Sequence, residues 1–288
     1  MTLESHTEYL SIETPEGARK IAFQSWQRTG GGDAPLLICV HGLTRNRHDF
    51  DFIAHSMTAY YRVVTVDIIG RGDSDRLQNP EYYGYPLYVS QMMQLLKHLA
   101  SVTGETRCDW LGTSMGGLIG MMIAATPGSP IDRLILNDIG PEIPLAGLQR
   151  LSEYVGKAPP FFSFQEVEAY QRVVASGFGD LTDEQWNHMA RYAATLESDG
   201  FYRMNYDPAI ALAFEGLNEG IDLTPVWQAV SCPVLVLRGE DSDLLTAECA
   251  ERMAEKRDVR LVSFPGTGHA PALFSEDQIA AVRDFLVM

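Results

Sequence analysis

Residues 108–122 contain the feature that most constrains how this chain can fold. An apolar run beginning at Cys108 ends at Gly112, Ser114 and Gly116 complete the spacing Gly-x-Ser-x-Gly, and a segment rich in small residues and methionine follows directly. A serine whose hydroxyl must stand clear of a sheet requires a tight, strained turn, and only a residue without a β-carbon fits on either side of it. The stretch therefore predicts a strand, a sharp turn and a helix.

The same turn would supply a nucleophile and an electrostatic partner for it. The amide of Met115 falls at the start of the expected helix, where N–H groups lack helical partners and the helix dipole is positive. Such an amide can stabilise the negative charge that develops on an attacked carbonyl oxygen. Gly-x-Ser-x-Gly alone is a weak pattern, because a glycine-rich turn without a catalytic role has the same composition. Other parts of the chain must distinguish these two interpretations.

Length and charge narrow the classes of function. At 288 residues the chain can bury the core of one large domain, with room for an insertion. Its net charge of −16 argues against a nucleic acid or an anionic membrane surface as a partner. The first residues lack the apolar core of a secretory signal, and no apolar run is long enough to span a bilayer. The cysteines are widely spaced, which favours buried thiols over a metal site or disulfides and is typical of a cytoplasmic protein. They are Cys39, Cys108, Cys232 and Cys249.

Two segments near the amino terminus predict an edge and a central strand of a sheet. Residues 9–27 alternate between apolar and polar around a turn at 14–17, which indicates a β-hairpin. A glycine-rich loop is expected at 29–33. The continuous apolar run 36–40 is typical of a buried parallel strand, and it ends at His41-Gly42.

The loop after this strand holds a candidate for a second oxyanion donor. Sites in open α/β sheets form at the carboxyl ends of the strands. Gly42 lets the backbone turn, so the amide of Leu43 is expected to point over the sheet. We interpret His41 as a residue that fixes the loop by hydrogen bonding rather than as a catalytic base. Arg45 has two interpretations, a partner for an acidic substrate group or a contact with solvent or a helix end.

Strand-like and helix-like segments then alternate, which predicts an α/β fold with a mostly parallel sheet. Strands are expected at 62–67 and 133–138, and a helix over 87–101 precedes the strand that ends at Ser114. The loop 70–75 does not fit a dinucleotide fingerprint, because it lacks the third glycine and no helix follows it directly.

From residue 141 to 226 the pattern changes to helical stretches rich in aromatic residues, with no convincing core strand. An insertion placed after the carboxyl ends of strands is expected to cover a site as a lid. We therefore predict a core formed by residues 1–140 and 227–288 and a helical cap formed by 141–226. Many of its rings should pack the insertion itself, and a few should line an apolar substrate pocket. The rings are those of Tyr154, Phe161, Phe162, Phe164, Tyr170, Trp186, Tyr192, Phe201, Tyr202 and Tyr206.

A carboxylate and a histidine follow the last two expected strands. A serine hydroxyl is a poor nucleophile near neutral pH, so it needs a base and a carboxylate that orients this base. The strand 233–238 leads to Asp243, and the strand 259–264 leads to a loop that holds His269 between glycine and Ala-Pro. No histidines, cysteines or carboxylates cluster with metal-ligand spacing, so no metal site is expected.

The order Ser114, Asp243, His269 and these placements resemble the α/β-hydrolase family over nearly the whole chain. Residues 36–46 are similar to its oxyanion strand and loop, and 112–116 to its nucleophile elbow. Residues 234–245 are similar to its acid strand, and 268–271 to its histidine loop. The resemblance implies a mostly parallel sheet flanked by helices, with a helical cap inserted before the acid-bearing strand.

The position of the acid leaves alternatives open. The family often places its aspartate three residues after the glycine of this strand, and that position is Ser242 in this chain. We prefer Asp243, because the two leucines after it match the apolar step into the next helix. Asp241 and Asp138 are the alternatives.

The resemblance implies hydrolysis of a carboxylic ester through an acyl-enzyme intermediate. Ser114 would attack, His269 would act as base and then as acid, Asp243 would orient the imidazole, and the amides of Leu43 and Met115 would hold the oxyanion. No cofactor is required. The expected substrate is a small-molecule ester with an apolar or aromatic acyl group. Lactones, thioesters and carbon–carbon bonds of diketone acids are alternative substrates for the same triad. A hydrolase-like receptor that binds a ligand without turnover is a further alternative.

Overall fold

The apolar runs of the sequence form the centre of one eight-stranded sheet. The computed structural model describes residues 3–28 and 34–287, and the loop expected at 29–33 lies outside them. The strand order is β1-β2-β4-β3-β5-β6-β11-β12, and all pairs from β4 to β12 are parallel. The expected hairpin is the antiparallel pair β1–β2 at the edge. The strands are β1 (Leu3–Thr14), β2 (Gly17–Arg28), β3 (Leu36–Val40), β4 (Arg62–Val66), β5 (Cys108–Thr113), β6 (Ile131–Asn137), β11 (Val234–Gly239) and β12 (Val259–Phe264).

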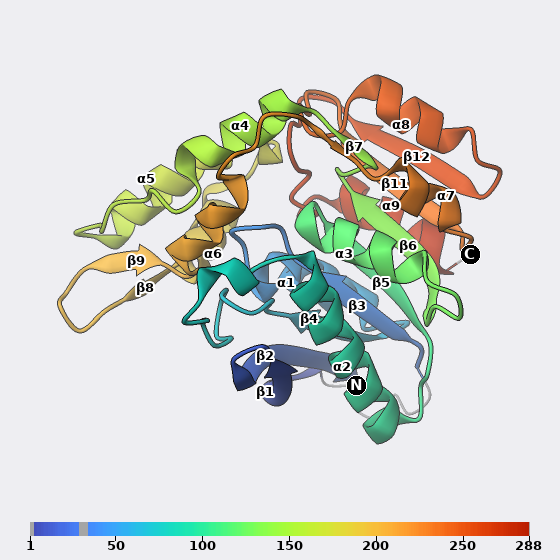
Figure 1. Cartoon of the computed structure of the whole chain (residues 1–288), viewed down its shortest axis with the longest axis horizontal. Coiled ribbons are helices and arrows are strands. Elements are labelled where there is room, and N and C mark those ends of the chain that lie inside the picture. Colours follow the sequence, from blue (N-terminus) through green and yellow to red (C-terminus); the bar gives the residue numbers. More distant parts are fainter. Residues whose placement is uncertain (1–2, 29–33, 288) are drawn as a thin grey trace.

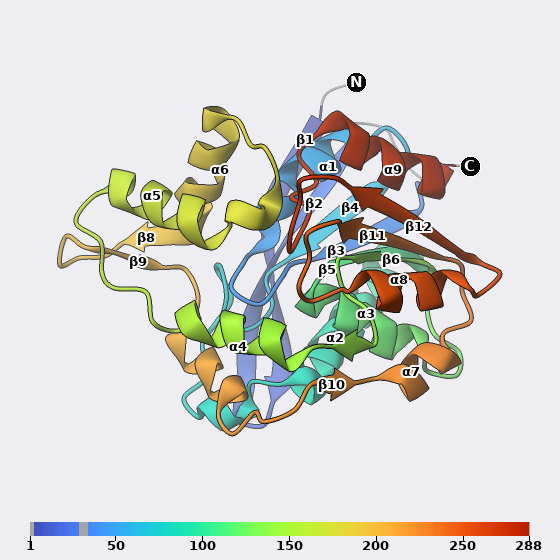
Figure 2. The same ribbon diagram turned by 90° about the horizontal axis from the view of Figure 1, so that it is seen from above.

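Alternate residues of the central strands face two different layers of helices. Leu37 and Cys39 of β3 pack against α1 and α9, whereas Ile38 and Val40 belong to the core beneath α2, α3 and α8. This is the two-residue period of a strand that is buried on both faces. Figure 2 shows the two helical layers with the sheet between them. Within the described residues, no helix combines the length and apolarity needed to cross a bilayer. The helices are η1 (Arg47–Phe50), α1 (Asp51–Met57), η2 (Pro80–Tyr82), α2 (Tyr85–Thr103), α3 (Met115–Ala124), α8 (Ala247–Ala254) and α9 (Glu276–Val287).

The chain between β6 and β11 forms a layer of its own, which we call the insertion (residues 141–226). Figure 1 shows α4, α5, α6 and the β8–β9 ribbon extending from one end of the sheet. Its short strands form two separate two-stranded ladders, and neither ladder joins the main sheet. The elements of this region are β7 (Glu142–Ile143), α4 (Leu145–Tyr154), α5 (Phe164–Val174), η3 (Ser176–Phe178), α6 (Asp183–Ala193), β8 (Ala194–Leu196), β9 (Tyr202–Met204), η4 (Pro208–Phe214), β10 (Ile221–Asp222) and α7 (Thr224–Ala229).

Candidate active site

Ser114 stands in the sharp turn between β5 and α3. Its φ of 50° is a left-handed conformation that costs an L-residue about 1–2 kcal/mol. A β-carbon at Gly112 would lie 2.3 Å from the backbone of Gly116, and one at Gly116 would lie 2.0 Å from the carbonyl oxygen of Val40. The crowding inferred from the sequence is therefore present, and both glycines are required for the helix to approach the strands this closely.

A hydrogen-bonded row of three side chains begins at this serine. The Ser114 Oγ and the His269 Nε2 are 2.9 Å apart, and the His269 Nδ1 lies 2.7 Å from the Oδ2 of Asp138. The side chain of His269 is 9% exposed and that of Asp138 is fully buried. An imidazole that donates from Nδ1 to a carboxylate presents Nε2 as the acceptor for the serine hydroxyl. This arrangement fits a general base next to a nucleophile.

The structure corrects the choice of Asp243 as the partner of His269. Asp243 instead receives two hydrogen bonds from Arg150 of α4, at 2.5 Å from Nε and 2.8 Å from Nη2. Burial tends to raise the pKa of Asp243, but the hydrogen bond and charge of Arg150 hold this pKa below its usual value. Asp241 is exposed, and it is not the carboxylate hydrogen-bonded to the imidazole of His269 either. Of the three carboxylates considered, the one on His269 is Asp138, at the end of β6.

Ser242 explains how the acid can come from β6. This residue occupies the position three residues after Gly239 at which the resemblance would place the aspartate, and its Oγ lies 2.5 Å from the Oδ2 of Asp138. The amide of Gly239 donates to the other oxygen, Oδ1, at 2.8 Å. Asp138 has a φ of 56°, a conformation that aspartate tolerates better than most residues. The carboxylate is therefore oriented by β11 although it belongs to β6.

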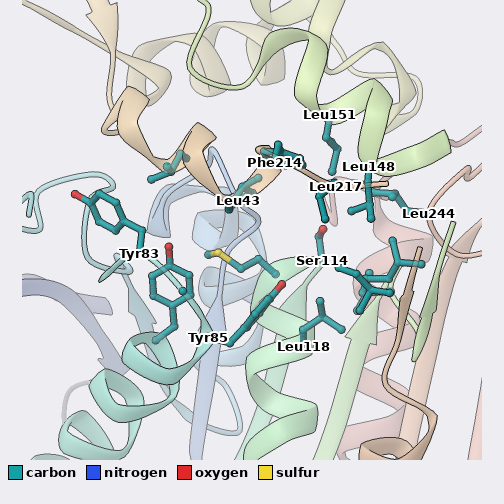
Figure 3. A pocket seen from close by; sticks show the side chains of 18 residues that line it. Leu43, Tyr83, Tyr85, Ser114, Leu118, Leu148, Leu151, Phe214, Leu217 and Leu244 are labelled. Atoms are coloured by element: carbon teal, nitrogen blue, oxygen red, sulfur yellow. The ribbon is translucent and has the colours of Figure 1, made fainter. Parts of the chain in front are cut away.

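A large apolar cavity opens beside Ser114. Its volume is about 250 Å³. Figure 3 shows Ser114 at its wall, with leucines of the insertion on one side and tyrosines of the core on the other. The lining residues are Leu43, Tyr83, Gly84, Tyr85, Tyr88, Ser114, Met115, Leu118, Ile139, Ile143, Leu148, Leu151, Ile210, Ala213, Phe214, Leu217, Ile221 and Leu244. None of the insertion rings that the sequence analysis named lines this cavity. The insertion instead contributes Phe214, which was not among them.

A smaller pocket of about 60 Å³ lies on the other side of the serine. It shares Leu43, Ser114 and Leu151 with the large cavity, and it is also lined by His269. Its remaining lining residues include four rings of the insertion, Tyr154, Tyr170, Phe178 and Tyr206, together with Arg45, Gln171 and Val174. Ser114 thus lies where a large apolar cavity meets a smaller pocket that contains charged and polar side chains.

Arg45 is already paired within the protein. Its guanidinium makes hydrogen bonds to Asp49 from both Nε and Nη2, and its Nη1 donates to the side chain of Gln171 at 2.7 Å. Because Asp49 neutralises this charge, the interpretation as a partner for an acidic substrate group loses its basis. Arg45 instead joins the loop after β3 to helix α5 of the insertion.

The loop that carries Leu43 is fixed by two side chains, those of His41 and Arg71. His41 is fully buried, donates from Nδ1 to the carbonyl of Gly42 at 2.7 Å and accepts the amide of Ile68 at Nε2. Burial lowers the pKa of His41 to about 3, so its imidazole is neutral and suits a structural role. Arg71 donates from Nε to the carbonyl oxygen of Leu43 at 2.9 Å. No sequence pattern indicated this role of Arg71, which lies in a loop considered only for nucleotides.

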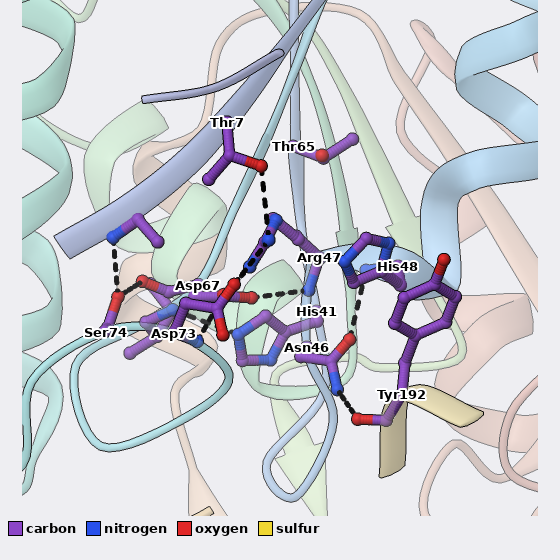
Figure 4. Close-up of polar contacts among 12 residues, drawn as sticks. Thr7, His41, Asn46, Arg47, His48, Thr65, Asp67, Asp73, Ser74 and Tyr192 are labelled. Atoms are coloured by element: carbon purple, nitrogen blue, oxygen red, sulfur yellow. Dashed lines mark hydrogen bonds and ion pairs between the residues drawn. The ribbon is translucent and has the colours of Figure 1, made fainter. Parts of the chain in front are cut away.

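A buried ion pair supports the same loop from below. Asp67, at the end of β4, is fully buried and accepts both the amide and the guanidinium of Arg47, as Figure 4 shows. Arg47 also reaches Asp73 with Nη2 at 2.6 Å. A β-carbon at Gly72 would overlap the Asp67 carboxylate, so only glycine fits there. The network joins the start of η1, directly after the Leu43 loop, to the loop at 70–75.

We expect Arg47→Met to lower the free energy of unfolding by about 3–5 kcal/mol, because it leaves the carboxylate of Asp67 buried without its cation. Urea unfolding at neutral pH measures the change. The double variant Arg47→Met/Asp67→Asn should recover part of the loss, since it removes the uncompensated charge. A loss below about 1 kcal/mol in the single variant would contradict a supporting role for the pair.

The described residues contain no group of three or more histidine, cysteine or carboxylate side chains arranged to hold a metal ion. Their four cysteines are unpaired, and Cys39, Cys108 and Cys249 are buried, which agrees with packing roles.

Comparison with known proteins places this geometry among hydrolases. The sequence profile described as the Alpha/beta hydrolase family matches residues 37–284. A 3-hydroxybutyrate-oligomer hydrolase from Cupriavidus necator is 37% identical over 298 aligned positions, which cover 99% of each chain. A 2-(acetamidomethylene)succinate hydrolase from Mesorhizobium japonicum is 25% identical over 88% of this chain and 89% of its own. The crystal structure of an alpha/beta hydrolase from Novosphingobium aromaticivorans is 34% identical, has a TM-score of 0.88 and covers 99% of this chain and 98% of its own.

Proposed function

The chain belongs to the α/β-hydrolase family, and from this premise we propose that it is a serine hydrolase that cleaves carboxylic esters through an acyl-enzyme intermediate. The observation that carries the proposal is the row from Ser114 through His269 to Asp138. We assign Ser114 as nucleophile, His269 as base and acid, Asp138 as the orienting carboxylate and residues 141–226 as a cap over the site. The unpaired cysteines agree with a reducing compartment such as the cytoplasm.

The chemistry follows from the positions of these groups. His269 takes the hydroxyl proton as Ser114 attacks the ester carbonyl, and the negative charge moves to the carbonyl oxygen. We assign the amides of Leu43 and Met115 as the donors that stabilise this oxyanion. Both residues line the large cavity beside Ser114, and Met115 is the first residue of α3. His269 then gives the proton to the leaving alcohol, and afterwards takes one from the water that releases the acid.

The two pockets receive different halves of the ester. The group that protonates the leaving oxygen must contact it, and His269 lines the smaller pocket but not the large cavity. The alcohol therefore belongs in the smaller pocket and the acyl group in the large one. A cavity of about 150 Å³ accommodates benzene, so about 250 Å³ corresponds to an acyl chain of roughly eight to ten carbon atoms.

The relatives favour an ester over a carbon–carbon bond as the group that is cleaved. The relative that aligns over 99% of both chains is named for hydrolysis of 3-hydroxybutyrate oligomers, in which the units are joined by ester bonds. The hydrogen bond that holds the Leu43 loop and the contact between Ser114 and His269 also support turnover over simple ligand binding. No metal or cofactor enters the proposed mechanism.

Labelling and burst kinetics test the proposal. A p-nitrophenyl octanoate substrate should give a burst of about one p-nitrophenolate per active site when deacylation is slower than acylation. A p-nitrophenyl alkylphosphonate should inactivate the enzyme with one equivalent bound, and peptide mass analysis should place it on Ser114. Absence of turnover with esters of all chain lengths from two to ten carbons would refute the esterase assignment, whatever the outcome of labelling.

We expect Leu148→Trp to shorten the preferred acyl chain, because the indole would fill the large cavity from helix α4. The kcat/KM for a p-nitrophenyl octanoate should fall at least tenfold relative to the acetate. Val174→Trp is the matched control, since Val174 lines the smaller pocket. It should change the ranking of alcohols in a series of octanoate esters and leave the ranking of acyl chains intact. Equal effects of both substitutions on acyl length would show that the pockets are assigned the wrong way round.

A further inference from the structure

Among the described residues, one side-chain hydroxyl in the large cavity makes no hydrogen bond. Three tyrosines line the core side of this cavity, and two of their hydroxyls are engaged. The Tyr83 hydroxyl donates to Asp207 at 2.7 Å and accepts the amide of Leu77 at 2.8 Å. The Tyr88 hydroxyl accepts from the Nη1 of Arg71 at 2.9 Å. Within the described part of the chain, the hydroxyl of Tyr85 makes no hydrogen bond, and its ring packs against the apolar core and edge-on against the ring of Tyr88, with 6.1 Å between the ring centroids.

The Tyr85 hydroxyl is directed at the reaction centre. Figure 3 shows the Tyr85 side chain rising from the start of α2, with its oxygen turned toward Ser114. Burial raises the pKa of this phenol, so it keeps its proton and can act as a hydrogen-bond donor. The Tyr85 side chain is partly exposed and lines a cavity with apolar walls, so an acyl group that fills the cavity would displace the water at its hydroxyl, and the loss is recovered only when this group supplies a partner. An unsubstituted alkyl chain would leave this requirement unmet.

We propose that Tyr85 selects acyl groups that carry a hydroxyl close to the scissile carbonyl, so that the preferred substrates are esters of medium-chain 3-hydroxy acids. This inference rests on the proposed esterase function and on the assignment of the large cavity to the acyl group. The leucines and isoleucines of the cavity contact the alkyl part of the chain, while Tyr85 bonds the hydroxyl near the carbonyl. The size of the apolar cavity favours a medium-chain acyl group over a short 3-hydroxybutyryl group, because the short group would leave most of the cavity empty.

Two matched esters and two matched variants test the proposal. The kcat/KM values of p-nitrophenyl 3-hydroxyoctanoate and p-nitrophenyl octanoate are measured for the wild type, for Tyr85→Phe and for Tyr88→Phe. The wild type should prefer the hydroxylated ester by about 3- to 10-fold, the effect of one buried hydrogen bond. In Tyr85→Phe this ratio should fall below one, because the substrate hydroxyl would then be buried without a partner. Tyr88→Phe should keep the wild-type ratio, because the proposal assigns the bond with the substrate hydroxyl to Tyr85, whereas the Tyr88 hydroxyl accepts from Arg71.

The position of the hydroxyl gives a second readout. The 7-hydroxyoctanoate ester has the same composition but carries its oxygen far from the carbonyl, and it should react more slowly than the octanoate in all three proteins. A wild-type ratio at or below one for the 3-hydroxy ester, or a ratio that Tyr85→Phe leaves unchanged in a variant with wild-type Tm, overturns the role of Tyr85. Failure of every ester to react would instead refute the esterase function itself.

Discussion

Replacement of Asp138 by asparagine is expected to lower kcat about 10⁴-fold, the effect seen when a triad carboxylate is neutralised without a change of shape. Asparagine keeps the size of the side chain and tolerates the φ of 56° at this position, so the fold should persist. Its NH₂ group can face the Nδ1 of His269, which stabilises the imidazole tautomer that cannot accept the Ser114 proton. Steady-state kinetics with a p-nitrophenyl ester measure the loss, and thermal unfolding checks that the variant is folded.

Asp243→Asn is the matched control for this substitution. It removes the ion pair with Arg150, whose two side chains are 38% and 41% exposed, so both stability and kcat should change little. We expect kcat to stay within about threefold of the wild-type value. A large loss in Asp243→Asn together with a small loss in Asp138→Asn would reverse our assignment of the acid.

The carboxylate can also be moved back to the strand on which the sequence predicted it. In Asp138→Gly/Ser242→Asp, glycine adopts the left-handed backbone of residue 138 without strain and leaves space beside His269. An aspartate at 242 starts from the position whose Oγ now contacts the Asp138 carboxylate. The double variant should regain at least tenfold in kcat over Asp138→Gly alone. A double variant no better than the glycine variant would mean that β11 cannot present a carboxylate to His269.

Ser114→Ala should have the largest effect, a loss of about 10⁵- to 10⁶-fold in kcat, because in the described part of the chain no other nucleophile is hydrogen-bonded to the imidazole of His269. Alanine retains the β-carbon and therefore the strain of a φ of 50°, so stability should remain near that of the wild type. Ser114→Gly should be equally inactive and should gain about 1 kcal/mol in free energy of unfolding, since glycine relieves the strain. Residual turnover above a few per cent in either variant would show that the reaction does not proceed through Ser114.

The sequence predicted those parts of the site that depend on local geometry. The elbow at Ser114 needs only a strand, two glycines and a helix in succession, and the loop of His269 needs only the last strand of the sheet. The mostly parallel sheet followed from continuous apolar runs separated by helices. In each of these cases the determining residues are neighbours along the chain, so the pattern is visible without the fold.

The acid could not be predicted in the same way, because it is determined by contacts between distant residues. Asp138 and Asp243 both follow strands whose carboxyl ends meet at the site. Arg150, 93 residues from Asp243 along the chain, engages that carboxylate. Ser242 then orients Asp138 across 104 residues. The residues next to either aspartate in the sequence do not indicate which of these distant side chains it will contact.

The contribution of the insertion to the cavity was predicted in outline but not in residue type. Its aromatic rings drew attention in the sequence, yet several of them pack with one another, as Phe161, Phe164, Tyr170 and Tyr202 do. Tyr154 and Tyr206 line the smaller pocket, as does Tyr170 from the same cluster. The large cavity is lined by aliphatic residues and Phe214 of the insertion and by tyrosines of the core, and their roles depend on which face each helix turns inward. Composition alone does not give that orientation.

The catalytic side chains and much of the wall of the large cavity come from different parts of the chain, which suggests how such a protein can be re-engineered. Ser114, His269 and Asp138 all lie outside residues 141–226, whereas this segment supplies nearly half of the wall that would surround an acyl chain. Its contribution consists of Ile143, Leu148, Leu151, Ile210, Ala213, Phe214, Leu217 and Ile221. Chimeras that exchange this segment between related proteins should therefore inherit the chain-length preference of the donor and the reaction of the recipient, provided that Arg150 and Gln171 keep their anchoring contacts.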